Sequence, residues 1–243
     1  MKSRTALSVY PESAAQNEGA LRKNRTWFAD NDWYKDVQKE LELYRYIGLS
    51  ATRETRDSRR LLDVGNGGVF CYPFAHIPEV VAIDVFVEES FRRRYPGVQW
   101  LQMSALEMKF DRPFDTIIEI NTLHHIIGNS VRATYANLHR FFEAATSNLE
   151  PDGKLVLVES TVPRWFLGPY KLIYPVLVKF WPLSHPPTFQ FHFRDLLDSA
   201  TRYGLKLAEF CWIPKTSDVM AFGIRVPYWL SPIRVGKFVF FKG

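Results

Sequence analysis

The stretch LLDVGNGG at residues 61–68 constrains this chain more than any other part of its sequence. Apolar residues around Asp63 predict a strand that is buried on both faces, and the glycine-rich turn after it lets the backbone take positive φ and approach a ligand closely. A second apolar run, residues 80–83, ends in Asp84. This is about the offset at which nucleotide-binding folds place the acid that binds ribose. The two strands therefore predict a site for a ribose-bearing ligand.

Composition predicts an ordinary globular protein. The chain has 243 residues, of which 47% are hydrophobic and 23% charged, enough for one large or two small domains with a sizeable core. Aromatic residues make up 15% and favour an aromatic-lined cavity. The net charge of +5 is compatible with an anionic ligand or a membrane surface. We interpret the arginine clusters at 53–60 and 92–94 as solvated helix faces and expect no nucleic-acid partner.

Cysteine usage and the chain's start favour a reduced, cytoplasmic setting. Cys71 and Cys211 are the two cysteines, and no cysteine or histidine spacing is typical of a metal site, so no metal is predicted. Residues 1–10 lack the apolar core of a signal peptide. Segment 165–181 is unusually apolar, but two lysines and two prolines interrupt it, and its apolar runs are too short to cross a bilayer.

Strand-like and helix-like segments alternate along most of the chain, which predicts a parallel sheet with helices on both faces and right-handed crossovers. A polar turn joins runs 205–213 and 219–226, so we expect a closing antiparallel hairpin. The strands are expected at 61–64, 80–84, 98–102, 115–120 and 154–160, and the helices at 27–49 (capped by Asp30 or Asn31), 130–149 and 193–203, with a charged connector at 52–60.

We expect a single domain, 1–243, whose parts differ in role. Residues 61–162 form the ligand-binding core, and the parts on either side are expected to cover it. These are an N-terminal helical cap at 1–60, an aromatic lid insertion at 163–192, and a last helix, closing hairpin and tail at 193–243.

The glycine pattern argues against a dinucleotide. A dinucleotide loop has G-x-G-x-x-G opening a helix, but here the third glycine is missing and Pro73 interrupts the expected helix. Asp63 would repel a pyrophosphate, whereas it suits a cationic group such as an ammonium. A ligand with an amino-acid end, a ribose and an adenine satisfies these features, and S-adenosylmethionine (SAM) is such a ligand.

Two further motifs strengthen this interpretation: FDTIIEINTLHH at residues 114–125 and NLEPDGKLVLV at residues 148–158. With these motifs the chain resembles the class I SAM-dependent methyltransferases over roughly residues 40–226, especially the group that acts on small molecules. The resemblance implies a Rossmann-like, doubly wound α/β sheet of seven strands, mostly parallel, with one antiparallel strand in a C-terminal hairpin. It also implies S-adenosylhomocysteine as the product.

The resemblance assigns the cofactor-binding residues. Asp63 and the loop would hold the methionine end, Asp84 the ribose hydroxyls, and a carbonyl of Asn121 the ammonium. Two departures from the family pattern stand out: Val69 occupies the place of the last glycine, and Ser104 stands where an acid often precedes Ala105, so that this pair is either an adenine contact or a simple connector. The full predicted set is Asp63, Gly65, Asn66, Gly67, Asp84, Val85, Phe86, Ser104, Ala105 and Asn121.

Candidate catalytic residues follow the fourth and fifth predicted strands. Histidine titrates near neutral pH, so His124 or His125 could remove a proton from the acceptor. Glu159 at the end of the fifth strand could orient that imidazole. The alternative is that one of these histidines only packs beside the cofactor. His185 and His192 are fallback candidates with an expected structural role.

The acceptor is expected to be a small apolar or aromatic molecule, or one linked to a lipid or a glycan, methylated at oxygen. Nitrogen or carbon methylation and a non-catalytic SAM-binding protein remain alternatives, and a nucleotide-dependent oxidoreductase is the weaker rival. The fourth-strand motif lacks the Pro-Pro-Tyr of enzymes that methylate nucleic-acid bases. Segment 165–181 could instead rest on a membrane surface. The aromatic residues expected to cover the acceptor are Trp27, Trp33, Tyr34, Tyr44, Tyr46, Trp165, Phe166, Tyr170, Tyr174, Phe180 and Trp181.

Overall fold

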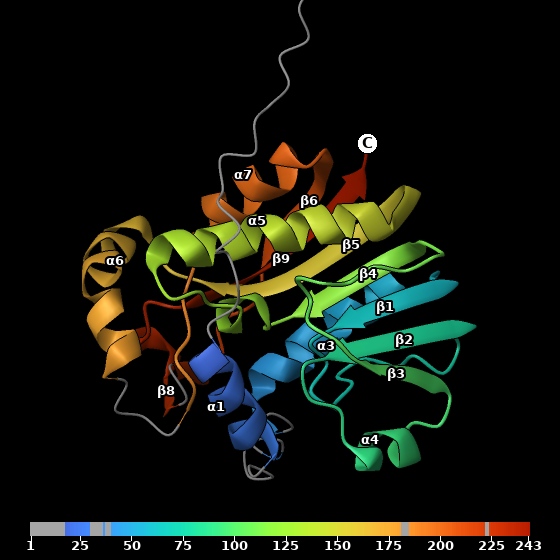
Figure 1. Ribbon diagram of the computed structural model, residues 1–243, viewed down its shortest axis with the longest axis horizontal. Coiled ribbons are helices and arrows are strands. Elements are labelled where there is room, and N and C mark those ends of the chain that lie inside the picture. The colour runs from blue at the N-terminus through green and yellow to red at the C-terminus, as the bar shows by residue number, and fades with distance from the viewer. Residues whose placement is uncertain (1–17, 30–35, 37–39, 181–184, 222–223) are drawn as a thin grey trace, which may run out of the picture.

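The protein is built around a seven-stranded sheet (Figure 1). The computed structural model describes residues 18–29, 36, 40–180, 185–221 and 224–243. The sheet has the order β3-β2-β1-β4-β5-β9-β6, in which the first five strands are parallel and β9 runs antiparallel to both of its neighbours. Its strands are β1 (Arg60–Val64), β2 (Glu79–Asp84), β3 (Val98–Gln102), β4 (Phe114–Ile120), β5 (Leu149–Thr161), β6 (Leu205–Trp212) and β9 (Arg234–Lys242). The predicted fold class is confirmed.

The predicted pairing of the closing hairpin is wrong. Strand β6 pairs with β9, while β7 (Asp218–Ala221) and β8 (Ile224–Pro227) form a separate two-stranded sheet. The reason is burial: β9 lies between two strands and is covered on both faces, so it needs a nearly continuous apolar run, which the segment VGKFVFF supplies. Strand β8 is mostly exposed and carries the exposed Arg225.

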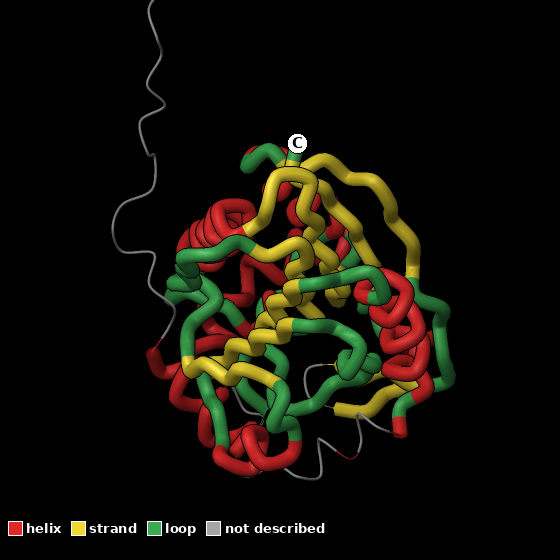
Figure 2. The backbone as a smooth tube through the Cα atoms, turned by 90° about the vertical axis from the view of Figure 1, so that its right-hand side faces the viewer, coloured by secondary structure: helices red, strands yellow, loops and turns green. Residues whose placement is uncertain are grey.

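Helices cover both faces of the sheet, as the end-on view in Figure 2 shows. Alternate residues of each central strand face opposite sides, so Leu62 of β1 packs in one hydrophobic cluster and Leu61 in the other. The first cluster includes side chains of α5, α6 and α7, and the second includes side chains of α3. The helices are α1 (Glu18–Ala29), α3 (Glu42–Thr55), α4 (Glu89–Arg94), α5 (Val131–Asn148), α6 (Arg164–Lys179) and α7 (Phe193–Arg202), with short 3-10 turns η1 (Leu123–His125) and η2 (Tyr228–Leu230).

The predicted helices at 130–149 and 193–203 are confirmed by α5 and α7. Ser130 caps α5, because its side chain accepts a hydrogen bond from the backbone N–H of Ala133. The predicted connector at 52–60 is partly wrong, since α3 continues to Thr55. The predicted caps Asp30 and Asn31, and the aromatic residues Trp33, Tyr34 and Trp181, lie outside the described residues.

A buried ion network explains why α3 extends so far. Lys237 of β9 is fully buried, and its ammonium donates to Glu54 of α3 at 2.6 Å and lies 2.9 Å from Glu209 of β6. Arg53 of α3 contacts the same two carboxylates. A buried charge needs such partners. The last turn of α3 is therefore tied to the two strands that close the sheet.

The crossover from β1 to β2 contains no helix among its residues 65–78, all of which the structure describes. Aromatic rings pack there instead: Phe70 lies 4.1 Å from Phe74 and 5.1 Å from Tyr95 between ring centroids. This aromatic loop leaves room for a cavity beside the glycine turn. No helix of the described part of the chain combines the length and apolarity that a membrane span requires.

Candidate functional site

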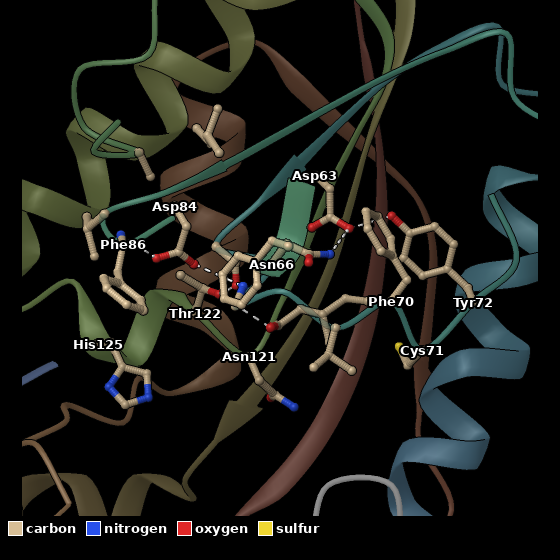
Figure 3. Close-up of a pocket in the computed structure, with 18 of the residues that line it drawn as sticks. Asp63, Asn66, Phe70, Cys71, Tyr72, Asp84, Phe86, Asn121, Thr122 and His125 are labelled. Carbon is tan, nitrogen blue, oxygen red and sulfur yellow. Dashed lines mark hydrogen bonds between the residues drawn. The ribbon is translucent and has the colours of Figure 1, made fainter. Parts of the chain in front are cut away.

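A cavity of about 490 Å³ opens at the carboxyl ends of β1, β2 and β4 (Figure 3). Ligands bind at this edge in open α/β sheets. The volume falls within the range of small-molecule pockets. Its walls come from the three strand ends, the aromatic loop 65–78 and α3. The lining residues include Tyr44, Arg45, Asp63, Gly65, Asn66, Gly67, Tyr72, Asp84, Val85, Phe86, Met103, Ala105, Asn121, Thr122 and His125.

Asp63 lies at one end of the cavity, and one of its carboxylate oxygens accepts two hydrogen bonds. The hydroxyl of Tyr72 donates to Oδ2 at 2.5 Å, and the side-chain amide of Asn66 donates to the same atom at 2.8 Å. Burial raises the pKa of Asp63 to about 6, although both hydrogen bonds act in the opposite direction. A cationic group in the cavity would favour the ionised form.

Asp84 lies at the end of β2 and is held by backbone donors. The N–H of Gly67 donates to one carboxylate oxygen and the N–H of Phe86 to the other, each at 3.0 Å. Burial raises the pKa of Asp84 to about 6. Figure 3 shows both acids pointing toward the same space, Asp84 beside Phe86 and Asp63 beside Tyr72.

The path of the glycine loop explains the departure at Val69. Gly65 has φ +73°, and a Cβ there would come within 2.2 Å of the Thr122 side chain. Gly68 has φ +79°, and a Cβ there would come within 2.3 Å of the Phe91 ring. The left-handed backbone disfavours other residues at both positions. Gly68 therefore meets a packing requirement of its own, and Val69 lines the cavity.

The end of β4 is shaped by a buried carboxyl group. Glu119 is fully buried and accepts hydrogen bonds from the backbone N–H groups of Thr122 and Leu123. Burial, with the nearby charge of Glu159, raises its pKa well above the usual range. Asn121 then takes a left-handed conformation with φ 54°, which asparagine tolerates better than most residues. This turn directs the chain into η1.

His124 and Glu159 form the predicted pair. The Nδ1 atom of His124 lies 2.7 Å from Oε1 of Glu159, which is fully buried. Ser160 also donates to Glu159, and its hydroxyl lies 2.7 Å from Oε1 of Gln190. His124, Ser160 and Gln190 line a second, smaller cavity. Tyr44 and Asn121 line both cavities, so the two spaces are adjacent.

His125 occupies a different environment from His124. It lines the first cavity, and burial together with His124 and His185 lowers its pKa well below the usual value. Burial likewise lowers the pKa of His185 to about 4, and its ring packs edge-on against Trp27. His192 caps α7 through a hydrogen bond from the N–H of Arg194. Both fallback candidates therefore have structural contacts.

The structure brings most of the predicted cofactor-binding residues to one cavity wall. The exception is Ser104, which does not line the cavity and accepts a hydrogen bond from the N–H of Leu106, as the connector alternative expects. Sequence reasoning missed Arg45, Tyr72 and Thr122 as site residues. The aromatic pattern singled out Tyr44 only as a cover for the acceptor. The predicted cofactor-binding residues that line the cavity are Asp63, Gly65, Asn66, Gly67, Asp84, Val85, Phe86, Ala105 and Asn121.

Comparison with known families identifies the core of the chain. Residues 62–157 match a family model described as a methyltransferase domain. No curated protein sequence matches the chain.

Solved structures share the fold at low sequence identity. The 1,6-didemethyltoxoflavin N1-methyltransferase of Burkholderia thailandensis, solved with S-adenosylhomocysteine, has a TM-score of 0.62 at 16% identity, covering 96% of this chain and 93% of that one. Magnesium protoporphyrin IX methyltransferase of Synechocystis PCC 6803 has a TM-score of 0.60 at 12% identity, covering 92% and 100%. Geranyl diphosphate C-methyltransferase of Streptomyces coelicolor A3(2) has a TM-score of 0.56 at 11% identity, covering 80% and 78%.

The loop geometry predicts that Gly68→Ala destabilises the protein. A left-handed alanine costs about 1–2 kcal/mol, and its Cβ would also overlap the Phe91 ring. Urea unfolding followed by circular dichroism measures the loss. Gly97→Ala is the matched control, because a Cβ at Gly97 meets nothing within 4 Å. Equal unfolding free energies for the two variants would contradict the described loop path.

Proposed function

We propose that the chain is a class I methyltransferase that depends on SAM, and that it methylates an oxygen of a small, largely apolar acceptor. The match to a methyltransferase domain and the shared fold of SAM-dependent methyltransferases support the first part. The observation that carries the choice of oxygen is the pairing of His124 with the buried Glu159 beside the second cavity. A hydroxyl acceptor must lose a proton, and a histidine oriented by a carboxylate can take it.

The first cavity fits SAM by its charges. The ligand carries an ammonium, a carboxylate, ribose hydroxyls and an adenine. We assign the ammonium to Asp63 and to the backbone carbonyl of Asn121, and the ribose hydroxyls to Asp84. Arg45 is the one lysine or arginine side chain among the described residues that line this cavity, so it is assigned to the carboxylate.

The adenine is assigned to the apolar side of the same cavity. Val85 and Phe86 follow Asp84 directly, and Met103 and Ala105 lie on the facing wall. The open space next to Gly67, where a Cβ would meet nothing within 4 Å, supports close approach of the ligand to the loop. S-adenosylhomocysteine is the expected product.

Bound SAM supplies an already activated methyl group, so the protein has to position the acceptor and manage one proton. His124 is assigned to accept the acceptor's hydroxyl proton, and Glu159 to hold the imidazole in a fixed orientation. His125 is assigned to packing in the first cavity, because its lowered pKa makes it a weaker base.

The second cavity supports a neutral acceptor. Its polar lining consists of hydroxyl, amide and imidazole groups, and no lysine, arginine or carboxylate is among the lining residues that the structure describes. Thr188 offers a buried hydroxyl without a hydrogen-bond partner. The rest of the wall is apolar: Leu43, Val219, Met220, Ile233 and Val235. The volume of this cavity is about 40 Å³, so it suits the hydroxyl-bearing end of an apolar molecule and not the whole molecule.

SAM binding should weaken at low pH and in the variant Asp84→Asn. Both Asp63 and Asp84 have a pKa raised to about 6, so below pH 6 each loses the charge that attracts its ligand group. One unit below the pKa, about a tenth of each carboxylate is ionised, which predicts roughly tenfold weaker binding for each group. Calorimetry from pH 7 to pH 5 measures this. Asp84→Asn should bind weakly even at pH 7, and unchanged affinity would count against the ribose assignment.

Arg45→Ala should weaken SAM binding about tenfold, through loss of one charge-assisted hydrogen bond. Methylthioadenosine lacks the amino-acid end, so its affinity should not change. Arg92→Ala is the matched control, because Arg92 is exposed on α4 and does not line the cavity. If Arg45→Ala weakens both ligands equally, the carboxylate assignment fails.

His124→Asn and Glu159→Gln should lower methyl transfer about 10²–10⁴-fold while leaving SAM binding intact. The assay follows labelled methyl from SAM into an organic extract of cells. The exposed His76 provides the control variant His76→Asn. A wild-type rate of methyl transfer in His124→Asn would exclude this histidine as the base.

A further inference from the structure

Helix α6 has apolar side chains on two opposite faces. Its inner face, with Leu167, Tyr170 and Tyr174, is buried against the core. Its outer face repeats at helical spacing and is exposed: Trp165 is 73% exposed, Leu172 82%, Ile173 50% and Val176 60%, and Phe180, the residue after the helix, is 67% exposed. Contiguous exposed apolar surface of this kind marks an interaction site.

The charged side chains of α6 itself all have one sign. Helix α6 contains no aspartate or glutamate, and its basic residues are Arg164 and Lys179 at its two ends and Lys171 within it. Arg164 and Lys179 are exposed. Two copies of the chain that met through this face would bring like charges together, which disfavours a dimer. An anionic surface complements them.

We propose that the outer face of α6 docks on the surface of an anionic lipid bilayer. The helix would lie in the plane of the interface, with its apolar side chains among the acyl chains and its basic ends at the headgroups. Aromatic side chains near both ends, Trp165 and Phe180, suit the boundary between headgroup and acyl region. With 16 residues the helix is ~24 Å long.

The inner face of α6 connects this surface to the second cavity. The hydroxyl of Tyr170 donates to the backbone oxygen of Thr188 at 2.6 Å, and the ring of Tyr174 lies 4.8 Å from that of Phe189. Thr188 and Gln190 line the second cavity. Figure 1 shows α6 on the side of the sheet toward which β4 and β5 point. Docking would bring the second cavity close to the bilayer. The acceptor would then be a membrane lipid that carries a hydroxyl, and this step rests on the proposed function.

The test is co-sedimentation of the full chain with vesicles. One set contains phosphatidylcholine alone and the other contains one quarter phosphatidylglycerol. Wild type should bind the anionic vesicles, and added salt should weaken that binding. Leu172→Glu combined with Val176→Glu should weaken it at least about tenfold. Leu207→Glu is the matched control, an exposed leucine on β6, and should bind like wild type. Lys179→Glu should reduce the preference for anionic vesicles.

Three results would overturn the docking proposal. The first is that wild type does not sediment with anionic vesicles, and the second is that the double variant binds as wild type does. The third is a wild-type dimer that the double variant converts to monomer, with no vesicle binding by either. Circular dichroism of the same preparations verifies folding. Calorimetric SAM binding separates the two proposals, because failure of folded wild type to bind SAM contradicts the function without affecting the vesicle result.

Discussion

The close contact between Gly65 and Thr122 is the constraint on which the site depends. The threonine side chain occupies the space where a Cβ at residue 65 would lie, and its hydroxyl donates to the Gly65 carbonyl at 3.1 Å. The turn after β1 is thereby locked to the turn after β4. Both turns follow neighbouring parallel strands. Asp63 near the end of β1 and Asn121 just after β4 therefore face one cavity.

Three buried carboxyl groups near this contact have different partners and therefore different properties. Asp63 accepts side-chain donors and faces the cavity, where a cation would stabilise its charge. Glu119 accepts backbone donors, and burial beside Glu159 keeps its pKa high, so it shapes the start of η1. Glu159 faces His124. The same side-chain chemistry thus supports binding, backbone geometry and orientation of an imidazole at neighbouring positions.

The second cavity has a different character from the first. The first cavity is bounded by strand ends and a glycine loop, and the second by the segment that contains Thr188 and Gln190. That segment rests on α6, a helix that lies beyond the fifth strand. The match to the family model ends at residue 157. Thr188 and Gln190 therefore lie outside the part of the chain that the family model matches.

Local patterns in the sequence were sufficient to predict the fold class, most strands of the sheet and the placement of Asp63 and Asp84 at strand ends. The reason is that buried parallel strands and glycine turns are determined largely by residues that are neighbours along the chain. The choice between His124 and His125 as partner of Glu159 was decided only by tertiary structure, since a 3-10 turn sends adjacent side chains in different directions. Tertiary structure alone also decided that β6 pairs with β9 and that Arg45 lines the first cavity. A periodic apolar run shows that a strand or helix is buried, but which surface buries it depends on segments distant in sequence.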